Sequence, residues 1–391
     1  MTEHITREAP VRQVTFGPKY HFFGYYDKFP WDATGRYLLT LEADFVGRTP
    51  EPDDVARLCV IDLENNRAPR VIAETRAWNW QQGCMARWLP PHDDREVIYN
   101  DCVDGRFVSV VVDIETGDTR PLPFPIYGLS PDGSYAAAPN FARIHDHRPG
   151  YGYNGPPDPG EGRLCPENDG VWRLDIGTGE VTLIATIAEL AELRPDPDLA
   201  GNPQWLNHVQ INKDGSRIAI LHRWSTAEQG IRSTRLFIMN PDGSDKRCLA
   251  HRQLFSHYDW LGASHVLGWA RRPDGEQSNY ILYTDRSEEF AVVGEDVLTS
   301  DGHCSFSPDR RWLLTDTYPR QENRRVVILY RWPDGPRIDV ASFHSPPAFQ
   351  GEFRCDLHPR WSRDGAQVCI DSAHAEGRQM HVLDVSEIVR H

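Results

Sequence analysis

Four histidines recur at one position in four successive sequence repeats. Each stands three residues before a bulky apolar residue and shortly before a turn signal; the four are His208, His257, His303 and His358, followed by Ile211, Trp260, Phe306 and Trp361. Histidine is the commonest transition-metal ligand, and its ordinary pKa lies close to neutrality. Four imidazoles at one register therefore predict a metal site or a site of proton transfer. Four independent core residues would not explain the shared position.

The histidines belong to a longer pattern, which is an apolar strand, a turn close to Ser-Pro-Asp-Gly, and a second apolar strand. Seven copies of this pattern begin near residues 29, 86, 127, 209, 258, 304 and 359. Asp-Gly between alternating apolar runs is typical of a β-hairpin, and a third apolar strand such as 57–63 follows each copy. The repeats predict an all-β fold, a single seven-bladed β-propeller formed by residues 1–391.

Three further segments complete the expected fold. The strand at 11–16 is expected to complete the last blade and close the ring, which removes exposed sheet edges. The Pro- and Gly-rich stretch at 143–168 is expected to be a surface loop, and residues 187–195 a short helix.

Equivalent positions of successive blades face one central channel, so the four histidines should converge there. The second strand of each hairpin ends at the same face, where the expected rim consists of Asn100, Arg143, His222, Arg223, Arg271, Arg272, Tyr318, Arg320 and His374. Arginine binds carboxylates through a two-pronged fork. The pattern therefore predicts an anionic ligand bearing carboxylates, bound by Arg223, Arg271, Tyr318 and Asn100.

Other residues extend the candidate site. Cys355, three residues before His358, could add a soft ligand to a metal held by the four histidines. Histidine with cysteine suits Zn²⁺, and histidine with carboxylate or amide oxygen suits Mn²⁺. Tyr127 and Arg143 could form an acid–base pair. The segment 78–84, with Trp80 and Gln82, could be a structural plug between blades or a ligand platform, and so could 22–28.

The charge, hydropathy and cysteine content of the chain argue against some classes of protein. The chain has 391 residues and a formal net charge of −15, which argues against nucleic-acid binding. The mean hydropathy is −0.56, and from the sequence we expect neither a bilayer-spanning segment nor a secretory signal. Eight cysteines do not form a disulfide framework in a chain of this size. A cytoplasmic protein with reduced thiols is the expectation.

The segments HVQ, SHYDW, DGHCSFSPD and LHPRWS, with the seven hairpins, resemble the propeller polysaccharide lyases, above all the oligogalacturonate lyases and the ulvan lyase-like enzymes. The first resemblance implies a divalent metal, typically manganese, with His303 and His358 as ligands, His257 lining the cleft and Arg232 as the base. Cys355 or Asp356 stands where that family has a metal-binding glutamine. The second implies a His–Tyr pair with a neutralising arginine, matched by Tyr127 and Arg143, while Gln82 stands at the place of the histidine.

Three functions remain open. The first is a lyase that cleaves uronic-acid oligosaccharides by β-elimination, with Tyr127, Arg143, His208, His257, Arg232 and Gln82 as the catalytic candidates. Such an enzyme must neutralise the uronate carboxylate, remove the neighbouring proton and protonate the departing oxygen. The second is a glycoside hydrolase-like or other sugar-modifying propeller, which would need facing carboxylates, with Asp259, Asp316 and Asp356 as candidates. The third is a non-catalytic ligand- or protein-binding propeller.

Overall fold

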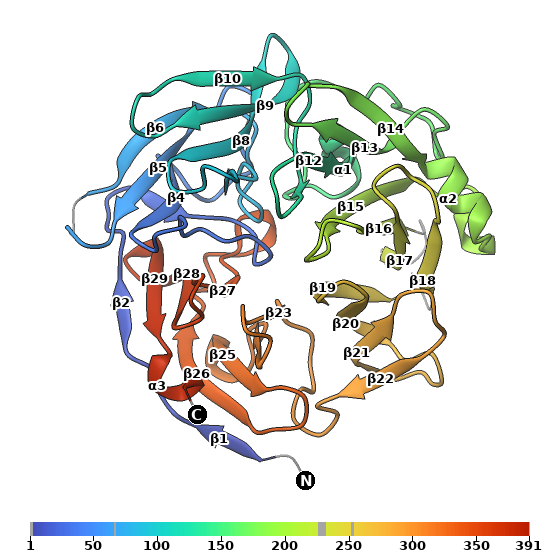
Figure 1. Cartoon of the computed structure of the whole chain (residues 1–391). Coiled ribbons are helices and arrows are strands. Elements are labelled where there is room, and N and C mark those ends of the chain that lie inside the picture. The colour runs from blue at the N-terminus through green and yellow to red at the C-terminus, as the bar shows by residue number, and fades with distance from the viewer. Residues whose placement is uncertain (1–2, 66–67, 226–231, 252–253, 391) are drawn as a thin grey trace.

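Seven β-sheets stand around a central axis in the computed structural model of the chain (Figure 1). The structure describes residues 3–65, 68–225, 232–251 and 254–390, and for Arg232 and Gln321 the backbone only. The fold is a seven-bladed β-propeller, as the repeats predict. Blades are numbered from one to seven in chain order.

The first five blades each consist of four consecutive strands. Blade one contains β3 (Tyr20–Phe22), β4 (Tyr37–Ala43), β5 (Ala56–Asp62) and β6 (Arg70–Thr75). Blade two contains β7 (Arg87–Trp88), β8 (Glu96–Val103), β9 (Arg106–Asp113) and β10 (Thr119–Leu122). Blade three contains β11 (Gly128–Leu129), β12 (Tyr135–Ala138), β13 (Gly170–Asp175) and β14 (Val181–Thr186). Blade four contains β15 (Gln204–Ile211), β16 (Ile218–Ser225), β17 (Arg232–Met239) and β18 (Arg247–Ala250). Blade five contains β19 (Phe255–Leu261), β20 (His265–Arg271), β21 (Ser278–Thr284) and β22 (Phe290–Val293).

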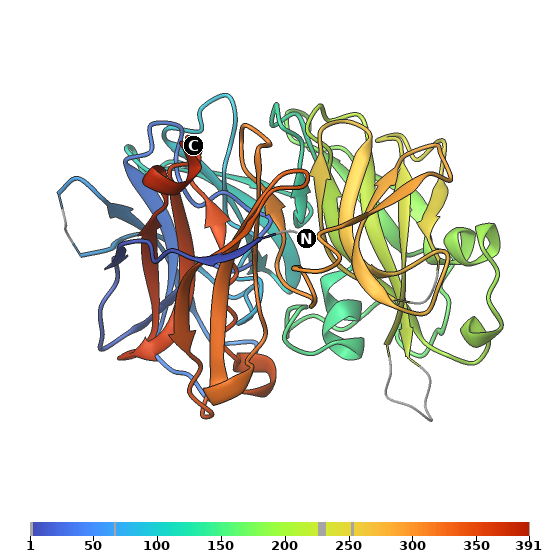
Figure 2. The same cartoon turned by 90° about the horizontal axis from the view of Figure 1, so that it is seen from below.

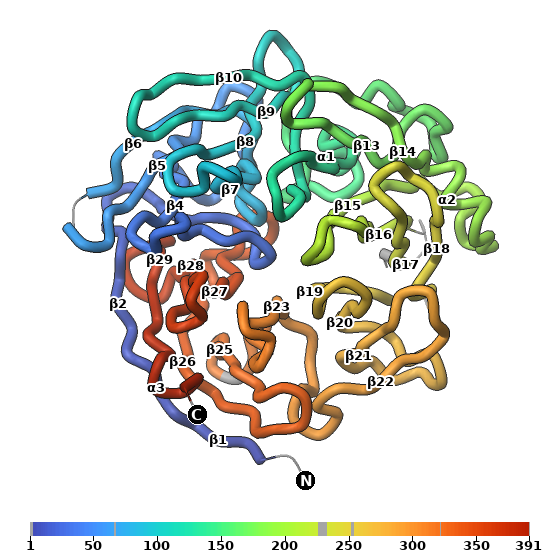
Figure 3. Tube along the Cα trace, in the orientation of Figure 1, coloured from blue at the N-terminus to red at the C-terminus, as the bar shows by residue number. Residues whose placement is uncertain are grey.

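The N-terminal segment contributes to the last two blades. Blade six contains β23 (Ser305–Phe306), β24 (Trp312–Asp316), β25 (Arg324–Arg331) and β26 (Arg337–His344); blade seven contains β27 (Arg360–Trp361), β28 (Gln367–Ala375) and β29 (Gly377–Asp384). β2 (Val11–Gln13) pairs antiparallel with β29 and completes blade seven, as predicted. β1 (His4–Thr6) adds a parallel fifth strand to blade six beside β26, which the sequence did not indicate. Both strands run along the outer edge of the ring (Figure 3).

Helices occupy the connections. The expected short helix is α2 (Ile187–Leu193), which Thr186 and Glu189 begin with a reciprocal capping box. A second helix, α1 (Phe141–His147), lies at the start of the stretch expected to be a surface loop, and the Asn140 side chain caps it by accepting from the backbone N–H of Arg143. The remaining helical segments are η1 (Pro197–Leu199), η2 (Gln321–Asn323), η3 (Gly351–Phe353) and α3 (Ser386–Val389).

The chain after α1 turns inward, so the prediction of a surface loop is wrong for this part of the segment. Tyr151 and Tyr153 are buried, and Gly150 lies against Glu352 of η3. Figure 2 shows α1 and η3 projecting from the same face of the ring. This face therefore carries two covering segments that reach toward the axis. Among the described residues, no helix is long and apolar enough to span a membrane.

Candidate functional site

Two interlocked loops bring side chains to the axis. Gly24, in the loop between β3 and β4, and Gly83, in the loop between β6 and β7, both have positive φ, at 129° and 63°. A Cβ atom on Gly24 would lie 2.5 Å from the carbonyl oxygen of Gln82, and one on Gly83 would lie 2.5 Å from that of Phe23. Only glycine allows this mutual approach. The contact joins the two loops whose side chains Tyr25 and Gln82 both reach His208.

Tyr25 stands in the middle of the four histidines. Its ring centroid lies 4.8 Å from that of His208, 5.0 Å from His358, 6.0 Å from His303 and 6.2 Å from His257. All five side chains are buried, and burial raises the pKa of Tyr25 well above its ordinary value. The shared register of the histidines thus brings them together around one protonated phenol, which we call the axial cluster.

At one end of the axial cluster, three side chains form a donor set that could bind a metal ion. Ligand atoms of His303, Asp356 and His358 all lie within 4.8 Å of one another. Both ring nitrogens of His358 and Nε2 of His303 are buried and have no hydrogen-bond partner in the described structure. Nδ1 of His303 lies 2.8 Å from Oδ1 of Asp316, the arrangement that orients a metal-bound imidazole. Two imidazoles with unpaired nitrogens and one carboxylate fit Mn²⁺ or Zn²⁺, with coordination positions left open.

The carboxylate of this donor set is held by two arginines. Oδ1 of Asp356 lies 2.8 Å from Nη2 of Arg325, and Oδ2 accepts a hydrogen bond of 2.8 Å from Nε of Arg354. Burial alone would raise the pKa of Asp356, but these guanidinium charges lower it to about 2. The carboxylate is therefore ionised, as a metal ligand must be.

His208 forms the opposite end of the axial cluster, and both its nitrogens are engaged. Nδ1 lies 2.9 Å from the Tyr127 hydroxyl and 3.3 Å from Nε2 of Gln82. Nε2 lies 3.2 Å from the Tyr25 hydroxyl and 3.4 Å from Nη1 of Arg148. Burial, with the charges of Arg223 and Arg148, lowers the pKa of His208 well below its ordinary value. Nη1 of Arg148 and Nε2 of Gln82 can only donate, so the hydrogen of the neutral ring can be accepted only by the hydroxyl oxygen of Tyr25 or of Tyr127.

His257 lies between the two ends. Its ring centroid is 4.2 Å from that of His303, and its Nδ1 is 3.0 Å from Oδ1 of Asp301. Burial lowers the pKa of His257, although Asp301 acts in the opposite direction. It is not part of the three-residue donor set found among the described residues.

Of the predicted ligand-binding residues, two border the axial cluster. The ring of Tyr318 lies 5.8 Å from that of His303 and 6.3 Å from that of His257. Arg223 is buried on β16, and its charge acts on His208. Arg271 lies elsewhere, half-buried at the end of β20, where it pairs with Glu276 at 3.5 Å. Arg232 begins β17, and its side chain is outside the described part of the structure.

Arg143 does not lie at a strand end beside Tyr127, so its predicted position is wrong. It is buried on α1, where Nη1 pairs with Asp158 at 2.9 Å and Nε donates to the carbonyl of Gln204 at 2.7 Å. Nη2 donates to the carbonyls of Arg163 and Leu164. These bonds connect the segment after α1 to blade four. The side chain is thus committed to the fold.

Three more predicted site residues serve the packing. Both polar groups of Asn100 are engaged, the amide nitrogen by Ile126 and Tyr153 and the oxygen by the backbone N–H of Ile126. Trp80 is fully buried against other aromatic rings and donates to the carbonyl of Arg48, which supports the plug interpretation of 78–84. Cys355 is buried and lies outside the donor set among the described residues, and burial raises the pKa of its thiol to about 12.

Several axial residues are not identified by the sequence patterns, above all Tyr25, Tyr151, Arg148, Asp301 and Arg354. Tyr25 lies in the segment 22–28, which is unusual in composition but gives no single residue a role. Tyr151 and Arg148 lie in the stretch that was expected to be a surface loop. Its density of arginine, histidine and tyrosine between glycines was the available signal, because plain surface loops rarely need such side chains.

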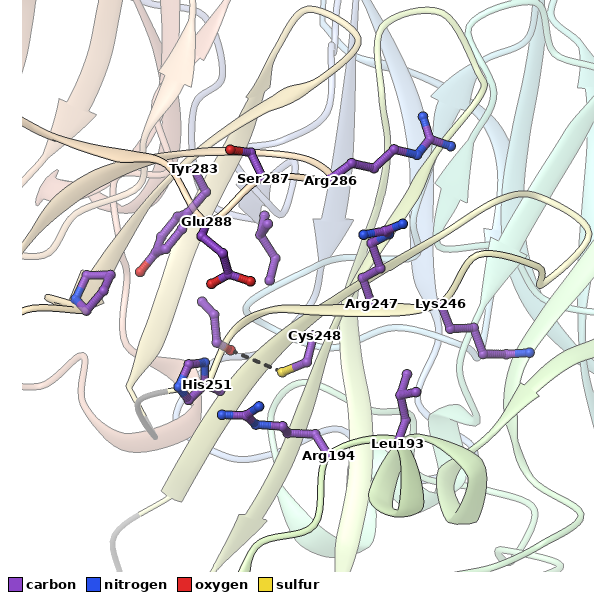
Figure 4. Close-up of a pocket in the computed structure, with 13 residues that line it drawn as sticks. Leu193, Arg194, Lys246, Arg247, Cys248, His251, Tyr283, Arg286, Ser287 and Glu288 are labelled. Atoms are coloured by element: carbon purple, nitrogen blue, oxygen red, sulfur yellow. Dashed lines mark hydrogen bonds between the residues drawn. The ribbon is translucent and has the colours of Figure 1, made fainter.

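A separate hollow of about 360 Å³ lies at the outer edge of the ring, beside α2 and β18 (Figure 4). Three of its cationic side chains have carboxylate partners. Arg247 and Arg286 both pair with Asp245, and Lys246 lies 3.8 Å from Glu189. Its lining includes no residue of the axial cluster.

Solved structures resemble this chain over nearly its full length. An oligogalacturonate lyase in complex with manganese is 16% identical, with 98% of this chain and 95% of that chain covered and a TM-score of 0.69. The oligogalacturonate lyase from Vibrio parahaemolyticus is 13% identical, with 98% and 96% covered and a TM-score of 0.67. The β-propeller domain of the Trilobed protease from Pyrococcus furiosus is 13% identical, with 94% and 95% covered and a TM-score of 0.54. No protein-family model matches the chain, and no curated protein matches it. At these identities the likeness shows the propeller fold.

Proposed function

We propose that this protein is a metal-dependent carbon–oxygen lyase that cleaves uronic-acid oligosaccharides by β-elimination. The observation that carries the proposal is the donor set of His303, Asp356 and His358, with buried nitrogens that have no other partner in the described structure. The full-length likeness to an oligogalacturonate lyase in complex with manganese supports it. The metal would be Mn²⁺ or Zn²⁺.

The chain supplies the means to bind an acidic sugar beside that donor set. When bound, a divalent cation supplies a Lewis acid for the uronate carboxylate. Arg148 is buried, and among the described residues no carboxylate forms an ion pair with it. A buried guanidinium without a counter-charge is costly. A substrate carboxylate would compensate it, and neutralising this carboxylate makes the neighbouring C5 proton easier to remove.

The departing oxygen also needs a proton. Tyr25 remains protonated because burial raises its pKa, and its hydroxyl lies 3.2 Å from Nε2 of His208. His208 in turn is fixed by Tyr127 and Gln82. In this arrangement Tyr25 donates to the leaving oxygen, and His208 holds the hydroxyl in place. Tyr127 and Gln82 act as positioning residues.

The carboxylates of this site are less suited to a hydrolase. A paired-carboxylate mechanism needs one free acid and one free base on either side of the bond. Asp316 is bound to His303, Asp356 to two arginines, and Asp259 to Lys213 at 3.0 Å.

The substrate in our proposal is an anionic oligosaccharide, and nucleic acid and membranes are not partners. We place the protein in the cytoplasm, where short oligosaccharides rather than polymers are available.

A direct assay tests the proposal. Purified protein is incubated with oligomers of galacturonate, glucuronate–rhamnose, mannuronate and guluronate, with and without Mn²⁺, while the ultraviolet absorbance of the unsaturated uronate product is followed. A metal-dependent rise with one oligomer, absent in H358A, is the expected result. Metal-loaded wild-type protein that leaves every oligomer intact would contradict the lyase and favour a sugar-modifying or binding propeller.

A further inference from the structure

Tyr151 is held between two positive charges at the edge of the axial cluster. Nη2 of Arg354 donates a hydrogen bond of 2.6 Å to its hydroxyl oxygen. The guanidinium carbon of Arg148 lies 3.7 Å from its ring centroid, within the range of a cation–π contact. The two arginines come from different segments, since Arg148 ends α1 and Arg354 follows η3. The contacts therefore depend on the chain around α1 and on the chain around η3, the two segments that cover this face of the ring.

Tyr151 also faces the axial cluster. Its ring centroid lies 5.9 Å from that of His208 and 6.3 Å from that of Tyr25, in both cases edge to face. Its side chain is buried. It approaches the metal donor set through Arg354, which binds both the Tyr151 hydroxyl and Asp356. Tyr151 thus lies on the side of the cluster where Arg148 would receive a substrate carboxylate.

The charges around Tyr151 favour its anionic form. Burial alone would raise its pKa, but Arg354 and Arg148 together outweigh burial, and the pKa of Tyr151 is lowered from its ordinary value. Asp356 opposes them, and Tyr25 and Tyr318 titrate in the same neighbourhood. The other axial tyrosines show the opposite direction, because burial raises the pKa of Tyr25, Tyr127 and Tyr318.

We infer that Tyr151 is the base of the elimination, with its oxygen activated by Arg354 and its ring held by Arg148. This inference rests on the proposed lyase function. The phenolate oxygen of Tyr151 takes the C5 proton, and the C5–H electron pair forms the C4–C5 double bond. The C4–O bond breaks, and the departing oxygen takes the proton of Tyr25. Transfer of the proton from Tyr151 to Tyr25 then restores both groups, so that no proton is gained or lost.

Arg148 gives this base a simple form of control. Without substrate, the Arg148 guanidinium lies against the ring of Tyr151 and lowers the pKa of its hydroxyl. When the substrate carboxylate binds Arg148, the guanidinium charge is shared, and the phenolate becomes a stronger base. Binding of the substrate carboxylate to Arg148 therefore makes the C5 proton more acidic and, at the same time, makes Tyr151 a stronger base.

Two measurements test the inference, with Tyr153 as the matched control. Tyr153 lies two residues away in the same segment, is equally buried, and interacts with Asn100 and Phe141 instead. In the Mn²⁺-supplemented lyase assay, Y151F should lose about 100- to 10,000-fold in kcat, the range for removal of a general base, with a small change in KM. Y153F should stay within a few-fold of the wild type. Y151F that turns over as fast as Y153F overturns the inference.

The second measurement does not need the substrate. Ultraviolet difference titration of metal-free protein follows the conversion of phenols to phenolates. Wild type and Y153F should contain one tyrosine that ionises below its ordinary pKa, absent in Y151F and shifted upward in R148M. If the wild type cleaves no oligouronide, the lyase proposal fails, and the titration still decides whether Tyr151 is the activated phenol. Identical titrations of wild type and Y151F overturn the inference.

Discussion

His208 and His358 occupy the same position of blades four and seven, and both have left-handed backbone, with φ of 54° and 42°. Such conformations cost about 1–3 kcal/mol each and persist where the surroundings enforce them. Their nitrogens nevertheless differ. His208 is bonded on both sides by Tyr127, Gln82, Tyr25 and Arg148, whereas both nitrogens of His358 lack a partner in the described structure.

A shared register therefore does not assign a role to a histidine. Side chains from other blades and loops provide hydrogen-bond partners for His208. Among the described residues, His303 and Asp356 lie close enough to His358 for the three to bind one metal ion. An imidazole that already has two partners cannot bind a metal without losing one of them. The metal-binding end and the proton-transferring end are thus two different sites built on one repeat.

The largest effect is expected at the metal-binding end. H358A should abolish metal binding and reduce turnover below detection, because it removes one of three protein ligands. Metal content of the purified protein, measured by mass spectrometry, checks this. H208A should retain the metal, since His208 lies outside the donor set. Loss of metal from H208A, or its retention in H358A, would contradict the division between the two ends.

At the other end, Y25F should lower kcat by about 100- to 10,000-fold while the metal content is unchanged, because the variant lacks the proton donor. The neighbouring Tyr26 is the control. Its hydroxyl binds the backbone of Tyr258 rather than a histidine, so Y26F should melt earlier but keep its turnover. Equal turnover in the two variants would show that Tyr25 is not the donor.

A smaller effect on metal binding is expected from substituting a carboxylate that accepts a hydrogen bond from one of the histidines. D316N should weaken metal affinity by about 10- to 100-fold, the usual effect of losing the partner of a metal-bound imidazole. D301N, which changes the partner of His257, should leave the affinity unchanged. Metal titration by calorimetry distinguishes them. If D301N weakened binding as much as D316N, His257 would belong to the metal-binding end.

The smallest effect on turnover is expected for the substitution R143M, although this substitution should lower the stability of the fold strongly. R143M leaves the buried carboxylate of Asp158 without its ion-pair partner and should cost about 3–5 kcal/mol in the free energy of unfolding. Folded R143M should still turn over substrate. R148M, five residues further along, should behave in the opposite way, with near-normal stability and reduced turnover. Thermal denaturation and the lyase assay together check the pair.

The propeller and the convergence of the four histidines can be predicted from the repeats alone. Turn residues and alternating apolar residues are local signals that repeat seven times, so blade positions and the closing strand β2 follow from them. Because every blade has the same geometry, a shared register implies a shared place at the axis. That reasoning needs no knowledge of contacts between distant segments.

The role of each histidine, by contrast, depends on contacts that only the folded chain creates. Asp316 follows His303 by thirteen residues, but Tyr25 and His208 are separated by 183 positions, and Arg354 and Tyr151 by 203. No local pattern encodes such pairs. Arg143 and Arg148 look alike in the sequence, yet the Arg143 side chain is bound by Asp158 and four carbonyls while the Arg148 side chain reaches the axis. Hydrogen bonding and burial, which depend on the whole fold, separate the structural arginine from the functional one.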